Sequence, residues 1–149
     1  MRYKSYQQGN DITLDGLKYH LRIVDNTHDA ELAILLKSAT IFTQEYFGIP
    51  LANCTVVQEH HHADTSYTLY LTNASNIRVT DWNNNEVSFT QIANNVLLDE
   101  AKTVRITYDC TPIEDSDRYA QIVYQIAGAN YDGQPEQIAN ILRNYPVVI

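Results

Sequence analysis

The spacing of apolar residues changes twice along this chain of 149 residues, and that change constrains the fold more than any single motif. Up to residue 51, and again beyond Pro112, apolar side chains recur at three- and four-residue steps, which is the period of an amphipathic helix. Between Cys54 and Tyr108 the step is two residues, and the segment is rich in β-branched and aromatic residues. The sequence therefore predicts an α+β protein, in which a β insertion at about 54–108 interrupts a small helical bundle.

Four helices are predicted from the helical spacing. The first is short, with Leu14, Leu17 and Leu21 on one face and Thr13 in position to cap its N-terminus. The second is long and is predicted to end at Gly48, because glycine accepts the left-handed conformation that terminates a helix. Its buried face is predicted to comprise Leu32, Leu35, Ala39, Phe42 and Tyr46. The predicted helices span about 14–22, 28–47, 116–131 and 135–144.

Five strands are predicted within the β insertion, because apolar and polar residues alternate there. Val104, Ile106 and Tyr108 alternate with polar residues, a pattern typical of an antiparallel sheet with one face in water. The three consecutive asparagines at 83–85 predict a hairpin turn, since asparagine tolerates positive φ better than most residues. A small antiparallel meander is the simplest arrangement of such strands. They are predicted at 55–61, 67–72, 77–82, 87–91 and 103–108.

Ten basic and eighteen acidic side chains give the chain a formal net charge of −8. This charge argues against a protein that binds nucleic acid through its phosphates, and against one that binds an anionic membrane surface. No segment approaches the roughly 18 apolar residues of a membrane span, so we expect none. The size favours a single domain over residues 1–149. The first ten residues contain no apolar run that could serve as a signal peptide, so we expect the protein to be made in a cytoplasm. Cys54 and Cys110 are far apart in sequence, and we expect both to be buried free thiols.

The segment EHHHAD, residues 59–64, is the one candidate for metal chemistry. On a strand, successive side chains point to opposite faces, so His60 and His62 would share one face and Glu59 and His61 the other. Two histidines could hold zinc only with a third ligand from elsewhere, and nothing in the sequence fixes that ligand. We therefore expect no metal, with His60 and His62 as the only candidate ligands. A solvated strand end is the favoured interpretation, and an interface sensitive to mild acid is a third.

The remaining motifs indicate structure rather than catalysis. The sequence has no phosphate-binding glycine loop and no nucleophile turn, so it predicts neither an enzyme nor a cofactor. Trp82 is expected to cover one side of a hairpin. Glu114, Asp115 and Asp117 are expected to cap a helix and to form a solvated turn. The apolar tail YPVVI, residues 145–149, is expected to dock on its own domain or on a neighbouring subunit.

Two blocks of sequence carry a family resemblance. LKYHLRIVDNTHDAELAILLKSATIFTQEYFGIPL, residues 17–51, combines a short helix, an acidic turn, a long helix with a central alanine and an aromatic-Gly-x-Pro exit. VRITYDCTPIEDSDRYAQIVYQIAGANYDG, residues 104–133, leads from a strand through a proline turn into a helix, and ILRNYP follows as a short terminal helix. The matching residues of the first block are Leu21, Arg22, Asp25, Asp29, Leu32, Ala39, Tyr46, Gly48 and Pro50. These blocks resemble the small head-tail connector proteins of tailed bacteriophages, also called adaptor or head-completion proteins.

The resemblance implies a structural virion protein in the neck, without enzymatic activity or a cofactor. Such proteins form a ring, commonly a dodecamer, below the portal protein, and join it to a tail or neck protein. DNA passes through the central channel without sequence-specific binding. The net charge of −8 suits such a channel, because negative charge repels phosphate and lets DNA slide.

Candidate contact residues fall into two groups. Partner-binding residues are expected in the tail, at Tyr145, Pro146, Val147, Val148 and Ile149. Candidates for the channel or for a subunit contact are Asn83, Asn84, Asn85, Glu86, His60, His61 and His62. Two alternatives remain open at this point. One is a metal-binding α+β module or enzyme built on His60 and His62, and the other is a cellular adaptor domain with the same helices and an unrelated partner.

Overall fold

The computed structural model describes residues 1–145. Residue contacts divide the chain into two compact units. The β unit comprises Met1–Gln7 and Ala52–Thr111, and the helical unit comprises Gln8–Leu51 and Pro112–Ile149. Each unit has its own cluster of buried hydrophobic side chains. The single domain predicted over residues 1–149 stays a prediction.

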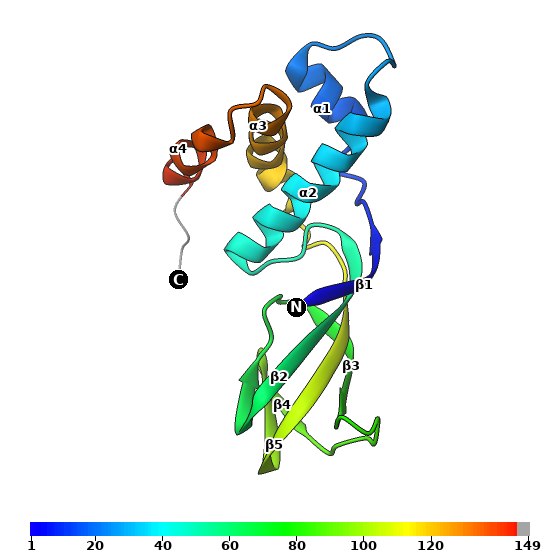
Figure 1. Ribbon diagram of the computed structural model, residues 1–149, viewed down its shortest axis with the longest axis vertical. Coiled ribbons are helices and arrows are strands. Elements are labelled where there is room, and N and C mark those ends of the chain that lie inside the picture. The colour runs from blue at the N-terminus through cyan, green and yellow to red at the C-terminus, as the bar shows by residue number, and fades with distance from the viewer. Residues whose placement is uncertain (146–149) are drawn as a thin grey trace. The chain divides into compact units, whose positions relative to one another are not determined.

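The helical unit contains the four helices that the sequence predicts (Figure 1). They are α1 (Leu14–Leu21), α2 (Asp29–Phe47), α3 (Ala120–Tyr131) and α4 (Ile138–Arg143). Short 3₁₀ turns, Ser116–Tyr119 and Pro135–Gln137, precede α3 and α4. Helix α3 packs against the other three helices, and α2 also packs against α1. Within residues 1–145, no helix is both long enough and apolar enough to cross a membrane.

Local signals fix both ends of α1. Thr13 Oγ1 accepts a hydrogen bond from Gly16 N at 3.0 Å, which is the predicted N-cap. At the other end, Arg22 adopts the left-handed conformation (φ 60°), and its N–H donates to carbonyl groups of the last turn. The Lys18 ammonium lies 2.8 Å from Asp29 Oδ1 and ties α1 to the start of α2.

The buried face of α2 differs from the prediction in its C-terminal half. Phe42 and Tyr46 are predicted to be buried, but they are 42% and 44% exposed and stack with ring centroids 6.3 Å apart. Thr43 and Gln44 are buried instead. Thr43 Oγ1 donates to a carbonyl one turn earlier (2.8 Å), and Gln44 Oε1 accepts from Leu51 N (3.0 Å). The prediction is wrong for the two aromatic residues, because hydrogen bonding allows polar side chains on the core face.

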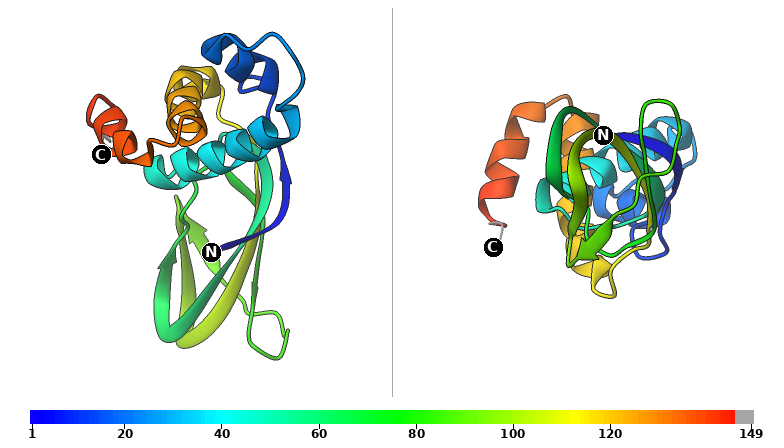
Figure 2. Two further views of the ribbon diagram at one scale, coloured as in Figure 1. Left: turned by 45° about the horizontal axis from the view of Figure 1, so that its top comes forward. Right: turned by 90° about the horizontal axis from the view of Figure 1, so that it is seen from below.

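The β unit is an antiparallel sheet in which two long strands, β2 and β5, run side by side (Figure 2). The strands are β1 (Arg2–Gln7), β2 (Asn53–Thr68), β3 (Ala74–Thr80), β4 (Thr90–Ile92) and β5 (Asn95–Cys110). Their order is β1-β2-β5-β3, and β4 also pairs with β5. The predicted antiparallel α+β class is confirmed. The pairings of β2 and β3 with β5 join residues far apart in sequence, which a simple meander does not do.

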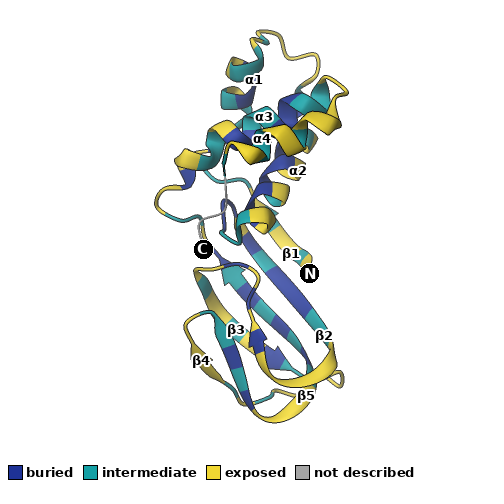
Figure 3. Cartoon of the chain, turned by 90° about the vertical axis from the view of Figure 1, so that its left-hand side faces the viewer, coloured by how far each residue is buried: buried dark blue, intermediate teal, exposed yellow. Residues whose placement is uncertain are grey.

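Buried and more exposed residues alternate along β5, as the sequence predicts (Figure 3). Val104, Ile106 and Tyr108 are fully buried, whereas Arg105 and Thr107 between them are partly exposed. The buried residues form the core of the β unit together with alternate residues of β2. The opposite face of the sheet is therefore free to carry polar side chains.

A fully buried glutamine organises the core of the β unit. Gln58 Oε1 accepts hydrogen bonds from the Tyr108 hydroxyl and from Tyr70 N (2.9 Å). Its amide Nε2 donates to Thr68 O at 3.2 Å. The side chain thus satisfies three polar groups, as a buried amide must.

Both cysteines are buried free thiols, as predicted. Cys54 of β2 and Cys110 of β5 are directly opposite each other in the antiparallel register. The hydrogen bond between the two thiols is the main cause that raises the pKa of Cys110 above the ordinary thiol value, and burial is the second. The pair therefore packs as two small neutral side chains.

The predicted strand 67–72 is only partly present, because β2 ends within it. Leu69 and Leu71 are nevertheless buried, as the alternation requires. Their N–H groups form hydrogen bonds outside a strand ladder, one to Asn94 O (2.8 Å) and the other to the Tyr108 hydroxyl (3.3 Å). The strand prediction is wrong for this part, because alternation reports burial and not the partner of the backbone.

Two other strands differ from the sequence prediction. No strand is predicted before residue 14, yet β1 pairs with β2, and its residues Tyr3 and Tyr6 pack against the core. The predicted strand 87–91 is replaced by the shorter β4. The chain before β4 pairs with β3 through an isolated bridge between Thr80 and Glu86 and a hydrogen bond from Val87 N to Val79 O.

Candidate contact surface of the β unit

The outer face of the sheet carries side chains from four strands that lie in register. One cross-strand row contains one residue each from β1, β2, β5 and β3, in the order Arg2, Val57, Thr107 and Arg78. The next row contains Glu59, Arg105 and Thr80. Because alternate side chains of a strand share a face, these residues point away from the core that Val104 and Ile106 occupy.

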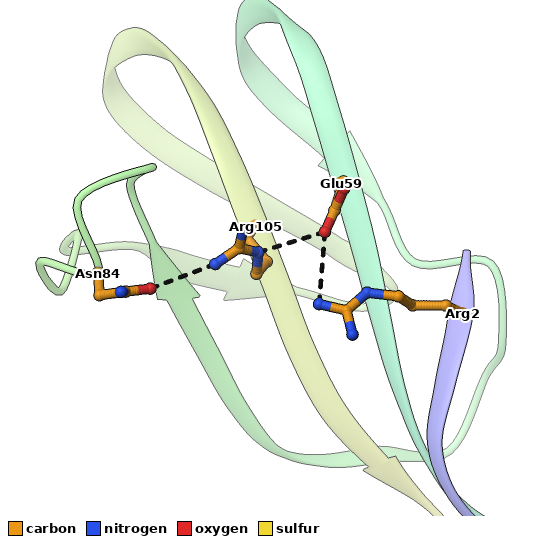
Figure 4. A network of polar contacts seen from close by, with 4 residues as sticks. All are labelled: Arg2, Glu59, Asn84 and Arg105. Carbon is orange, nitrogen blue, oxygen red and sulfur yellow. Dashed lines mark hydrogen bonds and ion pairs between the residues drawn. The ribbon is translucent and has the colours of Figure 1, made fainter.

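Glu59 and Arg105 are the centre of a polar network on this face (Figure 4). Glu59 Oε1 lies 3.4 Å from Arg2 Nη2 and 3.4 Å from Arg105 Nε. Arg105 Nη1 donates a hydrogen bond to Asn84 Oδ1 at 3.2 Å. The network thus joins β1, β2 and β5 to the loop that follows β3.

Trp82 covers part of the same face. The ring of His61 stacks on the Trp82 ring, with 4.9 Å between centroids and 17° between planes. The Arg105 guanidinium lies 4.9 Å from the Trp82 centroid, within the range of a cation–π contact. Trp82 packs on side chains of β2 and β5, and because it is 38% exposed it is also part of the surface. That it covers one side of its hairpin stays a prediction.

The turn predicted at the asparagines is present and is organised by Asp81. Asp81 Oδ1 accepts from Asn83 N and from Asn85 N, each at 2.9 Å. These hydrogen bonds lower the pKa of the Asp81 carboxyl below its ordinary value, and the bond from Asn85 N has the largest effect. Asn84 has a positive φ of 63°, as its residue type allows.

The structure brings together two of the segments that the sequence names as contact candidates. His61 stacks on Trp82, and Asn84 accepts a hydrogen bond from Arg105, which also contacts Trp82. In the sequence, 22 residues lie between His61 and Asn84. His60 lies on the other side of β2, with its ring 4.4 Å from that of Tyr67. The regular register of β2 is interrupted between His60 and Asp64. Across residues 1–145, no group of three or more potential ligands could hold a metal ion.

His60 titrates below the ordinary range of histidine. Burial is the main cause, and the positive N-terminal amino group and His61 lower its pKa further. Its Nε2 lies 3.3 Å from Gln58 Nε2, so a neutral ring can accept a hydrogen bond from the buried amide. Protonation would remove that acceptor, and the folded β unit therefore favours neutral His60.

Mild acid is therefore expected to destabilise the β unit through His60. Because the folded pKa is lower than the unfolded value near 6.5, the stabilising contribution of neutral His60 is complete above that value. The contribution is lost as the pH falls from about 6.5 through the folded pKa. Urea unfolding followed by the fluorescence of Trp82, the sole tryptophan, should show this loss between about pH 7 and pH 5.

The matched variants His60→Gln and His62→Gln test this assignment. His60→Gln should flatten the pH dependence, whereas His62→Gln, at an exposed position in the same segment, should leave it as in the wild type. Equal slopes for the wild type and His60→Gln would show that other groups cause the acid sensitivity.

The remaining predicted contact residues lie in the C-terminal tail. Tyr145 is half-buried and packs against the core of the helical unit. The predicted partner-binding residues Pro146, Val147, Val148 and Ile149 lie outside the described residues.

Sequence reasoning did not identify the arginines of the outer face. Arg2 is in a strand that was not predicted, and Arg78 faces the same side as Arg105 only because β3 pairs with β5. The alternation of Arg105 with buried residues was the one usable signal, since it placed this residue on the wet face.

Comparisons with known proteins identify the family. The chain matches the phage gp6-like head-tail connector protein family over residues 11–145. A chain from the neck of an empty gene transfer agent particle, computed with C6 symmetry, shares the fold with a TM-score of 0.58 and 13% identity. That match covers 100% of this chain and 97% of the other. A chain from the virion of a native gene transfer agent particle gives a TM-score of 0.62 and 14% identity, covering 99% and 95%. No curated protein sequence matches this chain significantly.

The two kinds of comparison have different weight. At 13% and 14% identity, the likeness to the solved chains shows the fold alone. The family match covers nearly the whole chain and includes parts of both compact units. The chain therefore belongs to the phage gp6-like head-tail connector proteins, a family of structural phage proteins and not of enzymes.

Proposed function

We propose that this protein forms a ring below the portal of a phage capsid and joins the capsid to the tail or neck. The observation that carries this proposal is the match to the head-tail connector family over residues 11–145. The likeness to a chain of a neck computed with C6 symmetry supports a ring, and twelve subunits are compatible with a sixfold axis. Its partners are further copies of itself, the portal protein and a tail or neck protein.

DNA passes through the central channel of this ring without sequence-specific contacts. The formal net charge of −8 supports this role, since phosphate is repelled by a surface that is negative on average. Strong counterion-releasing contacts between DNA and many lysine or arginine side chains would instead hold the DNA in place. The protein is made in the host cytoplasm and resides in the neck of the virion.

Two groups of residues are proposed as contacts of the ring. The tail residues 145–149 bind the portal or a neighbouring subunit through their apolar side chains. The outer surface that joins His61 to the loop 83–86 through Trp82 and Arg105 lies at the channel or at a subunit contact.

Purified phage particles provide the test of this function. Mass spectrometry should find the protein in intact virions, and electron microscopy should show its density as a ring at the portal exit. Removing residues 146–149, and keeping Tyr145 because it packs against the core of the helical unit, should leave the described fold intact and reduce incorporation into particles, because an apolar partner contact is lost. Absence of the protein from purified virions would overturn the proposal.

A further inference from the structure

The chain distributes its charge unevenly between the two compact units. The helical unit carries five basic and eleven acidic side chains, and therefore a formal net charge of −6. The β unit carries five basic and seven acidic side chains, a net charge of −2. Four of those five basic residues lie together around one depression on the outer face of the sheet. This basic face consists of Arg2, Lys4, Arg78 and Arg105, with Glu59 and Glu86 as the acidic side chains paired with its arginines.

The shape of the basic face suits an anionic protein surface. Arg2 and Arg78 stand at opposite ends of a cross-strand row, with the shorter side chains of Val57 and Thr107 between them. Three strand spacings separate the two arginine backbones, which is about 14 Å. The depression between them has a volume of about 280 Å³. Two long cationic side chains thus flank a low floor on which a partner can rest.

Positive charge remains uncompensated on this face. Arg2 and Arg105 share one carboxylate, that of Glu59, and Arg78 has only a 3.8 Å contact with Glu86. The side chains of Arg2 and Arg78 are 59% and 68% exposed. Four basic and two acidic side chains leave a net charge of +2, which an acidic surface would neutralise.

The helical unit presents an acidic surface at the turn that precedes α3. Ser116 Oγ donates to Asp11 Oδ2 at 2.6 Å and holds this carboxylate beside the turn that precedes α3. The resulting acidic turn consists of the exposed or partly exposed residues Asp11, Glu114, Asp115 and Asp117. Arg118 is the basic residue next to them in the chain, and its Nη1 is 3.9 Å from Asp115 Oδ2. Like charges so close repel one another, and a cationic partner would relieve that repulsion.

Asp115 shows that the acidic turn is not explained by helix capping. The sequence predicts a capping role for this cluster, and Asp115 does occupy the N-cap position of the 3₁₀ turn Ser116–Tyr119. Its side chain makes no capping hydrogen bond, so this part of the prediction is wrong. The carboxylate is exposed and available to a partner.

We propose that the basic face of one subunit docks on the acidic turn of a second copy of this chain. The inference rests on the proposed ring, because a ring needs two different, complementary patches on every subunit. The two patches belong to different compact units and have opposite charge, so their contact repeats head to tail. It assigns the outer network of Glu59 and Arg105 to the subunit interface and not to the DNA channel.

The composition of the basic face favours a protein partner over nucleic acid. The carboxylate of Glu59 lies between two of the arginines, where it would repel a phosphate backbone. The net charge of −8 also opposes the approach of DNA at long range.

Charge reversal in the full-length protein tests the proposal. Sedimentation velocity at low ionic strength should show self-association of the wild type. A high salt concentration should reverse this association, because salt screens the attraction between the two charged patches. Arg2→Glu with Arg78→Glu should weaken this association by more than about tenfold, and Asp115→Arg with Asp117→Arg should do the same. The two double variants should associate with each other when they are mixed, because the reversed, acidic face of the first is complementary to the reversed, basic turn of the second.

Lys102→Glu is the matched control for the single variant Arg78→Glu. Lys102 is an exposed basic residue of the same unit but lies outside the basic face, so its reversal should leave association unchanged. Circular dichroism should show that every variant is folded, since the reversed side chains are exposed. A monomeric wild type, equal effects of Lys102→Glu and Arg78→Glu, or no association of the mixed variants would each overturn the proposal.

Carbodiimide coupling identifies the contact directly, because it joins only an amine and a carboxylate that touch. Lys4 is the one amine of the basic face and should be coupled to Glu114, Asp115 or Asp117. Mixing ¹⁴N- and ¹⁵N-labelled protein separates couplings between copies from those within one chain. Couplings found only within one chain would overturn the proposed interface between copies. Binding of a short DNA duplex that Arg78→Glu abolishes would also contradict the proposal, because the basic face would then bind DNA. A ring that still forms in virions with the reversed face would overturn this inference and leave the proposed function standing.

Discussion

Gln58→Leu is expected to lower the free energy of unfolding of the β unit by about 3–5 kcal/mol. Leucine has nearly the same size, but it cannot accept from the Tyr108 hydroxyl and Tyr70 N or donate to Thr68 O. The Tyr108 hydroxyl would keep its bond from Leu71 N, but its proton and Tyr70 N–H would lose their acceptor, and Thr68 O would lose a donor. Each unsatisfied group in or next to the core costs about 1–3 kcal/mol. Urea unfolding followed by Trp82 fluorescence measures the change, because Trp82 is in the same unit.

Two companion variants separate the role of the buried amide from a general effect of substitution. Gln7→Leu replaces an exposed glutamine of β1 and should change the stability by less than about 0.5 kcal/mol. Tyr108→Phe removes only the hydroxyl and should cost about 1–3 kcal/mol, less than Gln58→Leu. A loss below about 1 kcal/mol for Gln58→Leu would mean that the freed groups find other partners, contrary to this account of the core.

Gly16→Ala is expected to destabilise the helical unit by about 1–3 kcal/mol, although the same change in a helix normally stabilises by about 0.5–1 kcal/mol. A Cβ atom at residue 16 would lie 2.1 Å from Tyr124 Oη and 2.7 Å from its Cζ. The ring cannot move away without cost, because its hydroxyl accepts a hydrogen bond from Thr13 N at 3.1 Å. Thermal unfolding followed by far-ultraviolet circular dichroism measures the loss, since the four helices are in this unit.

Gly128 provides a matched control in a second helix. A Cβ there would lie 3.1 Å from Leu21 Cδ2, the end of a flexible side chain that can shift by a small amount. Gly128→Ala should therefore be close to neutral, within about 1 kcal/mol. The background Tyr124→Leu removes the atoms that collide with residue 16, and Gly16→Ala should then cost less than it does in the wild type. Equal costs in the two backgrounds would show that the close approach of Tyr124 is not the cause.

The helices were predictable because their signals are local. Thr13 caps α1 and Gly48 ends α2 with φ of 70°, as the sequence predicts from neighbouring residues alone. The errors concern which residues face the core. Thr43 and Gln44 take the core face of α2 because their side chains form hydrogen bonds inside the unit, and Phe42 and Tyr46 are therefore exposed. The hydrogen bond of Gln44 depends on Leu51 N, which lies outside the helix.

The strands were predictable as alternating segments but not as a sheet. Leu69 and Leu71 are buried as predicted, yet their N–H groups bond to Asn94 and to a tyrosine hydroxyl instead of a strand. β1 escaped prediction because a short, polar edge segment has little apolar pattern of its own. Its assignment as a strand depends on pairing with β2, far away in the sequence.

The candidate surface shows the same division between local and long-range information. His61, the loop with Asn84 and the wet-face residue Arg105 could each be named from the sequence, but nothing in it joins them. They meet because β2 and β3 both pair with β5, which brings Trp82 between His61 and Arg105.

The sequence by itself determined the α+β class, the positions of the four helices, the wet and buried faces of β5 and the resemblance to head-tail connectors. These properties follow from hydrophobic period, caps and turn residues, which act over a few neighbouring positions. The tertiary structure alone decided the strand order, the partners of buried polar groups and the gathering of Arg2, Arg78 and Arg105 on one face. Those features depend on contacts between residues distant in the chain, and the packing and hydrogen bonds that select them have no local signature.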